Sequence, residues 1–470
     1  MAIIRFGVDG WDANEEHGEF DEASLRRLVE AVATIWAEDA PGATVYVGYD
    51  ARAGACEHAR IAAGVLAAFG LSAKLSDSMC PTPALGWTVA QDESAVGGIM
   101  ITANKLPGAF QGVRIRMEDG CSAPRHFTEM VEAELPPSPS IALAEYEEVD
   151  LLTPYLASLA AFVDSEAIRA AGLHVVVDPV YGASTGVLAG LMRTMGVAVD
   201  EIHAADGTGS LHGMAPDVVE PWVDGCCQAV RFSGADAGFV IDGDGDRCGA
   251  VANGGEFLSA HRIVPLVMRL LARERACEGR FVMTISASAL PRVYAEHLGR
   301  SMTITPTGFS GLHGEMVRGG VLMASEEYGG ISVPAHFMER DGLLVALLLL
   351  ELLATTGRSM AELLADLEQD VGTLHYMRRD LRIDAGDIQA LRNLLPGINP
   401  PEVAGTAPVL VSHADGLYLR FADDSWILLR PSRTDPLVRV YAEARTKDRG
   451  VALMEAACAF VRASDVHVVQ

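Results

Sequence analysis

The sequence predicts an α/β protein of several domains. The chain has 470 residues, which at about 100–200 residues per domain corresponds to roughly three or four domains. Short β-branched runs alternate with Ala- and Leu-rich helical stretches along the chain, a pattern typical of α/β units on mixed or parallel sheets. The pattern repeats three times and then changes near the C-terminus. We therefore expect three similar α/β domains with mixed sheets and a smaller α+β C-terminal domain.

Each of the three units has the same order: a strand, a helix and a second strand that runs into a polar loop. In chain order they are VYVGYD, 57–69 and 97–102; LHVVVDPV, 184–195 and DAGFVIDGDGDR; and FVMTISAS, 290–297 and VLMASEEYGG. Open α/β sheets bind ligands at the carboxyl ends of their strands. We therefore expect the loops at these strand ends to converge on one site.

Breaks in composition divide the chain into four predicted domains. A proline-rich PPSPS segment follows Leu135, a glycine-rich turn lies near Asn253, and the alternating pattern changes between Asp370 and Tyr376. The predicted domains are 1–140, 141–253, 254–370 and 371–470. In the last domain, VLVSHADGLYLRFADDSWILLRPS is typical of antiparallel strands joined by turns, and residues 449–463 favour a closing helix.

Composition and charge exclude several classes of protein. The chain carries 63 acidic residues against 36 Lys and Arg, a net charge of −27, so we expect no nucleic-acid and no membrane partner. Its 8 cysteines form no CxxC pair, which argues against a disulfide or zinc framework and favours a reducing compartment. The acidic start MAIIRFGVDGWDANEE lacks a signal-peptide pattern, and we expect a cytoplasmic protein. The apolar run 343–350 stops at Glu351 and therefore predicts a buried helix rather than a membrane span.

The acidic loop after the strand AGFVI is the most specific local signal. Asp242, Asp244 and Asp246 alternate with glycines, so their carboxylates can converge on one hard cation, and Mg²⁺ prefers such oxygen ligands. An EF-hand would need glycine at its sixth and glutamate at its twelfth position, where the chain has Arg247 and Asn253. The alternative is a solvated acidic turn, in which three aspartates would repel one another without a cation.

Two further loops carry groups that suit a sugar phosphate. Near the C-terminus, Arg430, Ser432 and Thr434 supply guanidinium and hydroxyl donors around a turn, which suits a phosphate dianion. An ordinary hairpin loop is the alternative. The segment Glu326-Glu327-Tyr328 precedes two glycines and offers paired carboxylates to vicinal sugar hydroxyls. The alternative is an acidic turn at the end of a strand.

These three segments, in this order, resemble the phosphohexomutase superfamily, the phosphoglucomutase and phosphomannomutase group. The blocks that are similar to the family extend over essentially the whole chain: FGVDGWDA, VGYDAR, PTPAL, PTGFSGLHGEM, ERDGLLVALLLLE and RPSRTDPLVRVYAEA. The resemblance implies four domains around a central cleft, Mg²⁺ as the cofactor, and a hexose phosphate or hexose bisphosphate as the ligand. The implied metal ligands are Asp242, Asp244 and Asp246, and the implied ligand-binding residues are Arg247, Glu326, Glu327, Tyr328, Arg430, Ser432 and Thr434.

The chain departs from the family at the nucleophile. The family passes a phosphoryl group through the serine of a Thr-Ala-Ser-His-Asn-Pro loop, and the matching residues 102–107 read TANKLP. Asn104 therefore stands at the nucleophile position, and its amide nitrogen, delocalised into the carbonyl, cannot carry a phosphoryl group. Lys105 replaces the family histidine, Asp12 an arginine and Arg114 a lysine. Arginine keeps its proton, so Arg114 is a poor general base.

Three functions follow from this combination. The first is a mutase that works by a modified route, with Thr102 or a water molecule in place of the serine. The second is a catalytically silent relative that binds hexose phosphate as a sensor or as the subunit of an active protein partner, with Asn104 offering its carbonyl oxygen to Mg²⁺. The third is another Mg²⁺-dependent phosphotransfer or phosphatase reaction. The substitutions favour loss of the serine-based reaction, and glucose, mannose and glucosamine phosphates all fit the segment Glu326-Glu327-Tyr328.

Overall fold

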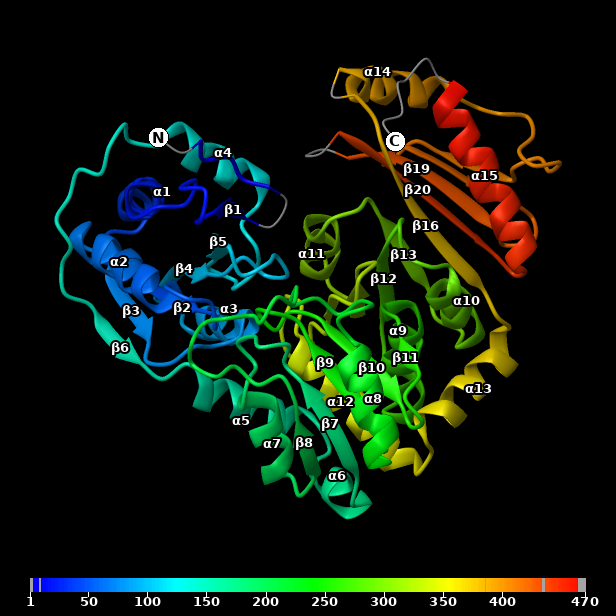
Figure 1. The fold of residues 1–470 in the computed structure, drawn as a ribbon, viewed down its shortest axis with the longest axis horizontal. Helices are drawn as coiled ribbons and strands as arrows, with labels where there is room; N and C mark the ends of the chain where they lie inside the picture. The colour runs from blue at the N-terminus through cyan, green and yellow to red at the C-terminus, as the bar shows by residue number, and fades with distance from the viewer. Residues whose placement is uncertain (1–2, 8–9, 385, 433–435, 464–470) are drawn as a thin grey trace.

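The computed structural model describes residues 3–7, 10–384, 386–432 and 436–463. They form four sheets with flanking helices, and we number the domains I to IV after these sheets. Domains I, II and III follow one another in an arc, and domain IV, drawn in orange and red in Figure 1, packs against domain III. The prediction of three α/β domains with mixed sheets and a smaller C-terminal domain is confirmed.

Domain I contains a six-stranded sheet in the order β1-β5-β4-β2-β3-β6. Its strands are β1 (Trp11–Asn14), β2 (Thr44–Tyr49), β3 (Ser72–Ser76), β4 (Ala95–Ile101), β5 (Phe110–Met117) and β6 (Glu147–Val149). Its helices are α1 (Glu22–Asp39), α2 (Ala55–Ala68), α3 (Thr82–Gln91) and α4 (Arg125–Ala133). Strand β2 pairs in parallel with β3 and β4, whereas β5 pairs antiparallel with both β4 and β1.

Domain II contains a five-stranded sheet in the order β11-β10-β9-β7-β8. Its strands are β7 (His174–Asp178), β8 (Ala198–Glu201), β9 (Ala237–Ile241), β10 (Cys248–Ala252) and β11 (Phe257–Leu258). Its helices are α5 (Leu152–Phe162), α6 (Ser165–Ala171), α7 (Val187–Thr194) and α8 (Asp224–Ser233). The antiparallel hairpin of β9 and β10 places the acidic loop at the end of β9.

Domain III contains a four-stranded sheet in the order β13-β12-β14-β15. Its strands are β12 (Arg280–Thr284), β13 (Met302–Thr305), β14 (Val321–Ser325) and β15 (Ile331–Ser332). Its helices are α9 (Ala260–Arg269), the π-helical turn η1 (Leu270–Glu274), α10 (Leu290–His297), α11 (Phe309–Val317), α12 (Gly342–Thr356) and α13 (Met360–Val371).

Domain IV contains an antiparallel sheet in the order β16-β20-β19-β18-β17. Its strands are β16 (His375–Arg382), β17 (Leu410–Ser412), β18 (Leu417–Arg420), β19 (Trp426–Pro431) and β20 (Leu437–Ala444). Its helices are α14 (Asp387–Leu394), the 3₁₀ turn η2 (Leu395–Gly397) and α15 (Lys447–Ala463), and the last of these is the predicted closing helix.

The first three domains share one topology. In each, two strands pair in parallel with a central strand, and the next strand adds antiparallel: β3-β2-β4-β5, β8-β7-β9-β10 and β13-β12-β14-β15. The internal repeat seen in the sequence pattern is therefore a repeat of strand order. Sheet pairing continues past two of the predicted boundaries, to residue 149 in the first sheet and to residue 258 in the second. The domain boundaries at 140, 253 and 370 stay predictions.

The apolar run 343–350 forms part of the buried helix α12, as predicted. Asp341 caps the helix by accepting a hydrogen bond from the backbone N of Leu344 (2.8 Å), and all residues from Gly342 to Leu353 are buried. Among the described residues no single helix is both long and apolar enough to cross a membrane; α12 and α13 meet the length and composition criteria only as a pair bent by 87°.

Candidate functional site

The three aspartates after β9 meet at one point. One carboxylate oxygen from each of Asp242, Asp244 and Asp246 lies within 4.8 Å of the other two, and all three side chains are buried. The backbone N of Arg247 donates to Asp242 Oδ1 (3.0 Å), and the Thr82 hydroxyl donates to Asp244 Oδ2 (2.8 Å). Within the described part of the chain, Asp242 Oδ2 and Asp244 Oδ1 have no hydrogen-bond donor. These two oxygens are therefore available to a ligand from outside the protein.

The charges of this acidic triad are only partly balanced by the protein. Burial and repulsion by Asp246 raise the pKa of Asp242 well above its usual value and that of Asp244 to about 7. Burial also opposes ionisation of Asp246, but the guanidinium groups of Arg340 and Arg247 outweigh it and lower the pKa of that carboxyl. Buried carboxylates with unpartnered oxygens fit a hard divalent cation, which takes oxygen ligands and restores the charge balance.

Arg340 is a central residue of the site that the sequence argument missed. Its side chain is 2% exposed; Nη2 lies 3.0 Å from Asp246 Oδ2, Nη1 2.9 Å from Glu326 Oε2, and Nε 3.3 Å from Glu339 Oε1. It joins the acidic triad of domain II to the predicted sugar segment of domain III. The block ERDG contained this arginine, but only the fold brings the partner at position 246 next to it.

Asn104 lies against the acidic loop. It follows β4, the residue is 9% exposed, and its Nδ2 donates to Asp246 Oδ1 (3.4 Å). Asn104 has a φ of +49°, a left-handed conformation that asparagine adopts more readily than most residues. A Cβ atom at Gly243 would lie 2.5 Å from the carbonyl oxygen of Asn104, so only glycine permits this close approach of the two loops. In the described structure Asn104 Oδ1 is buried without a hydrogen-bond donor.

Arg52 fixes the loop that carries Asn104, and the sequence argument assigned it no role. Its guanidinium group donates to four backbone carbonyls: those of Asn104 and Leu106 (both 2.6 Å), Pro107 (2.9 Å) and Phe110 (3.1 Å). Its Nε donates to Asp50 Oδ2 (3.1 Å), and both side chains are buried. The conformation of the loop is thus set by a buried arginine about fifty residues earlier in the chain.

Thr102, the alternative phosphoryl carrier, has its hydroxyl group occupied. The side chain is fully buried, Oγ1 donates to Asp50 Oδ2 (2.6 Å), and the backbone N of Asn104 donates to the same Oγ1 (2.9 Å). The hydroxyl therefore has a structural role in holding the loop, and it lies away from solvent in this conformation.

Two residues that are predicted to depart from the family pattern, Asp12 and Arg114, pair with each other. Arg114 Nη2 lies 2.7 Å from Asp12 Oδ1, across the antiparallel pairing of β1 and β5. The Arg114 side chain is 6% exposed and that of Asp12 is 29% exposed. The negative charge introduced at position 12 is therefore compensated within domain I by the arginine at position 114.

Lys105 and Tyr328 meet at the junction of the domains. Lys105 Nζ lies 3.2 Å from Asp217 Oδ2 of domain II and 5.1 Å from the centroid of the Tyr328 ring in domain III. The guanidinium of Arg378, on β16 of domain IV, lies 5.2 Å from the centroid of the same ring. Tyr328 is thus held between cations from domains I and IV, as expected of a residue at the point where the domains converge.

The two glutamates of the sugar segment have different surroundings. Glu326 is half-buried and binds Arg340, whereas Glu327 is buried and lies in the contact with domain IV. Arg378 Nη1 lies 3.2 Å from Glu327 Oε1, and the Tyr441 hydroxyl donates to Oε2 (3.2 Å). Burial raises the pKa of Glu327, although Arg378 opposes this shift. The contacts of Glu327 thus serve the joint between domains III and IV.

The predicted phosphate loop lies at the end of β19. Arg430 Nε donates to Asp415 Oδ2 (2.8 Å), an oxygen that also accepts a hydrogen bond from the backbone N of Thr307 (3.0 Å). Ser432 is buried, and its backbone N donates to the carbonyl of Leu437 (2.8 Å). Thr434 lies outside the described residues. Asp415, another residue that the sequence argument missed, thus connects Arg430 to domain III.

Four family profiles match the chain in the order of its domains. They describe the phosphoglucomutase/phosphomannomutase alpha/beta/alpha domain I over residues 4–138, domain II over 153–255, domain III over 259–371 and the C-terminal domain over 411–459. Together these matches cover most of the chain.

Similar proteins of known name or structure agree with the profiles. A phosphoglucomutase/phosphomannomutase of Thermococcus kodakarensis is 28% identical over 80% of this chain and 81% of its own length. A phosphoglucosamine mutase of Rubrobacter xylanophilus is 27% identical over 94% and 93%. The crystal structure of a provisionally named phosphomannomutase from Thermus thermophilus superposes with a TM-score of 0.85 at 30% identity, over 98% of this chain and 100% of that one. The chain therefore belongs to the phosphoglucomutase/phosphomannomutase family of the phosphohexomutase superfamily.

Proposed function

We propose that this chain binds Mg²⁺ and a hexose phosphate between its domains, and that it does not pass a phosphoryl group through the side chain at position 104. The observation that carries the proposal is the placement of Asn104. The resemblance predicts the family serine at this position; the amide found there lies on a loop packed against the acidic triad, and its Oδ1 is buried without a donor among the described residues. An amide oxygen is a ligand for a hard cation, whereas an amide nitrogen is not a nucleophile.

The donor atoms support Mg²⁺ as the cation. Asp242, Asp244 and Asp246 offer carboxylate oxygens, and Asn104 offers an amide oxygen in place of the phosphoserine oxygen expected from the family. Mg²⁺ takes six oxygen ligands and usually keeps some positions for water or a phosphate group. When bound, the ion would offset the repulsion among the three carboxylates and attract the phosphate of a ligand.

The ligand-facing residues support a sugar phosphate. Glu326 is half-buried beside Arg340, with a carboxylate suited to sugar hydroxyls, while Lys105 and Arg430 supply positive charge from domains I and IV. Phosphoglucomutases, phosphomannomutases and phosphoglucosamine mutases are the relatives of this chain, so a hexose phosphate is the matching ligand class. The Aspergillus fumigatus N-acetylphosphoglucosamine mutase was solved with GlcNAc-6P and magnesium; its likeness, at 15% identity and a TM-score of 0.61, concerns the fold.

A ³¹P NMR time course tests the proposal. The protein is mixed with Mg²⁺, a catalytic amount of glucose 1,6-bisphosphate, and in turn the 1-phosphates of glucose, mannose and glucosamine. We expect line broadening of one bound phosphosugar without conversion, and loss of that broadening in Asp244→Asn. Asp244→Asn purified in parallel also reveals any contaminating mutase, because a contaminant converts the substrate in both samples.

Absence of line broadening with every phosphosugar would overturn the proposal, and two other outcomes would assign a reaction to the site. Conversion of a 1-phosphate to its 6-phosphate by the unmodified protein, but not by Asp244→Asn, would show a mutase with a different carrier. Release of inorganic phosphate would show water acting as the nucleophile. Conversely, turnover gained in Asn104→Ser, or in a variant that also carries Asp12→Arg and Arg114→Lys, would place the loss of chemistry at these positions.

A further inference from the structure

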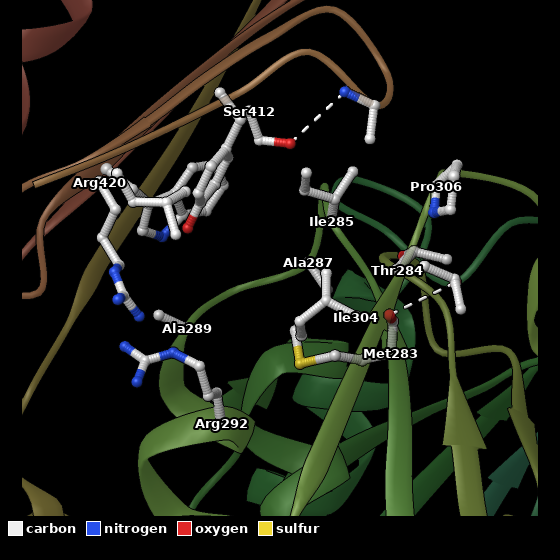
Figure 2. A pocket seen from close by; sticks show the side chains of 15 residues that line it. Met283, Thr284, Ile285, Ala287, Ala289, Arg292, Ile304, Pro306, Ser412 and Arg420 are labelled. Carbon is white, nitrogen blue, oxygen red and sulfur yellow. Dashed lines mark hydrogen bonds between the residues drawn. The ribbon is translucent and has the colours of Figure 1, made fainter. Parts of the chain in front are cut away.

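A cavity of about 270 Å³ lies between domains III and IV, and none of the residues predicted to hold the metal or the sugar lines it. Figure 2 shows its walls, which come from the strand ends of domain III and from the face of the domain IV sheet. Most of the lining is apolar or aromatic, including Met283, Ile285 and Ile304 on one side and Leu410, Tyr418 and Trp426 on the other. The cavity is large enough for a small organic molecule with one or two rings.

The walls of this cavity are held in place by a buried carboxylate. Glu443 accepts hydrogen bonds from the backbone N of Ala289 (2.6 Å) and from Trp426 Nε1 (2.7 Å), and both of these residues line the cavity. Tyr418 packs beside Trp426 with ring centroids 5.6 Å apart. The two aromatic side chains therefore present a fixed surface on which a flat apolar group can lie.

One end of the cavity is positively charged. Figure 2 shows the side chains of Arg292 and Arg420 pointing toward each other there. Arg292 is already paired, with Nη1 2.8 Å from Glu296 Oε1 and Nη2 3.2 Å from Asp424 Oδ1. The guanidinium of the half-buried Arg420 has no hydrogen-bonded or ion-paired partner among the residues that the structure describes. In a chain with a net charge of −27, an arginine left without a carboxylate beside an apolar cavity indicates an external anion.

The other end of the cavity is coupled to the phosphate loop. Pro306 and Ala414 line it. The next residue in each case, Thr307 and Asp415, takes part in a hydrogen bond from the Thr307 N to Asp415 Oδ2. The same Asp415 oxygen accepts from Arg430 Nε. A ligand seated between Pro306 and Ala414 therefore touches both sides of the contact that connects Arg430 to domain III.

We propose that this cavity is a second ligand site, for a small anion with a flat apolar body and one phosphate or carboxylate group. The apolar body lies on Tyr418 and Trp426, and the anionic group pairs with Arg420. Bound in this way, the ligand spans domains III and IV and fixes the position of domain IV, which carries Arg430. The inference is independent of the proposed function, since it uses none of the metal, sugar or phosphate-loop residues as ligands.

Isothermal titration calorimetry with three naphthalene probes tests the site. We use 2-naphthyl phosphate, 2-naphthoate and the neutral 2-naphthalenemethanol, so that the two anions distinguish phosphate from carboxylate and the alcohol reports the apolar contribution. We expect at least one anion to bind about tenfold more tightly than the alcohol, because a charged hydrogen bond to Arg420 is available to the anion alone. In Arg420→Gln this difference in affinity should disappear. The matched control is Arg382→Gln, which removes an exposed arginine of the same sheet and should retain the difference.

Two further variants locate the bound probe. Ile304→Trp places a large ring at the edge of the cavity from a strand position that is 42% exposed, and we expect it to abolish binding without harm to folding. Arg430→Gln should keep the difference in affinity between the anion and the alcohol, because Arg430 does not line the cavity. Equal affinities for anion and alcohol, no effect of Arg420→Gln, or loss of binding in Arg430→Gln but not in Arg420→Gln would each overturn the proposal.

Discussion

Two charged clusters near the nucleophile position differ in how their charge is balanced. The pair of Asp12 and Arg114 in domain I contains one carboxylate and one guanidinium 2.7 Å apart. The acidic triad of domain II contains three buried carboxylates, two of which have an oxygen with no donor among the described residues. The first cluster is complete within the protein, whereas the second carries carboxylate charge that the described residues do not balance.

The difference teaches which of the two clusters needs no ligand. The charge of Asp12, predicted to replace a family arginine, is offset by Arg114, so this pair is complete without a ligand. The triad leaves one oxygen each of Asp242 and Asp244 without a donor among the described residues, and a bound cation would satisfy them. The unbalanced triad next to Asn104 therefore supports the proposal of a protein that binds a metal and a phosphosugar without a serine carrier.

Removal of Arg340 should have the largest effect, because it makes the triad even less balanced. Arg340→Met leaves Asp246, Glu326 and Glu339 without the guanidinium that they share, and breaking a buried ion network costs about 3–5 kcal/mol. We expect a loss of that size in the free energy of unfolding measured with urea. Arg125→Met, which removes an exposed pair with Glu129, is the control and should cost about 0–1 kcal/mol. Equal losses in the two variants would contradict the argument.

Mg²⁺ should stabilise the protein through the triad by the next largest amount. At about one hundred times its dissociation constant, an ion that binds only the folded state adds about 2.7 kcal/mol to the free energy of unfolding. We expect thermal unfolding to shift upward with Mg²⁺ in the unmodified protein and not in Asp242→Asn or Asp244→Asn. Asp217→Asn removes a domain II carboxylate that pairs with Lys105 instead, and it should keep the response. A similar Mg²⁺ effect in all variants would place the ion elsewhere.

The pair of Asp12 and Arg114 should show a smaller, internal coupling. We expect a double-mutant cycle with Asp12→Asn and Arg114→Met to give an interaction energy of about 1 kcal/mol, within the range seen for residues in contact. Arg114→Met alone should cost more than the double variant, because it leaves the carboxylate of Asp12 without its partner. Unlike the triad variants, these variants should all retain stabilisation by Mg²⁺, because the three carboxylates of the triad stay in place. A zero coupling energy would mean that the pair is not formed in solution.

The smallest expected effect concerns a charge pair that is balanced between two domains. His313 Nε2 lies 2.7 Å from Asp119 Oδ2, and this hydrogen bond raises the pKa of His313. Burial opposes ionisation of Asp119, but the pKa of that carboxyl is still lowered, chiefly because of the hydrogen bond from His313. Because the pKa of His313 is higher in the folded than in the unfolded protein, its protonation stabilises the folded state. This stabilisation is full below the pKa of about 6.5 in the unfolded chain, and it is lost as the pH rises through the pKa in the folded protein. The pKa of Asp119 is lower in the folded protein, so its ionised carboxylate stabilises the folded state above the pKa of the unfolded chain. That stabilisation is lost only when the pH falls through the pKa in the folded protein.

The measurement for this pair is urea unfolding at about pH 5.5 and about pH 8.5. The unmodified protein should exceed His313→Gln by up to about 1 kcal/mol at the lower pH, and the difference should shrink at the higher pH. A gap that is independent of pH would assign His313 a packing role alone.

The strand and helix pattern was readable from the sequence because each unit is locally encoded. The predicted helix over 290–297 is observed at Leu290–His297, and the closing helix is observed over Lys447–Ala463. The buried helix α12 followed from its unbroken apolar run. The convergence of the triad was also predictable, because alternate positions on a glycine-containing loop lie close together whatever the rest of the fold.

The contacts of the site were not readable, because their partners lie far apart in the chain. Arg52 reaches Asn104, and Arg340 reaches Asp246, only after distant segments have packed. The sequence indicated that Asp12 replaces a family arginine and that Arg114 is a poor general base, and it gave no sign that the two residues pair. Glu326 and Glu327 are adjacent in sequence, yet one binds Arg340 and the other binds domain IV.

The sequence by itself determined the family, the four-domain α/β architecture, the acidic loop and the absence of a serine at position 104. These are properties of local pattern and residue identity. The tertiary structure alone decided which charges are balanced: Asp12 by Arg114, Asp246 by Arg340 and Arg247, and the remaining triad oxygens by no residue that the structure describes. The reason is physical, since the energy of a charge depends on its burial and on its neighbours within a few ångströms, and both are set by the packing of distant segments.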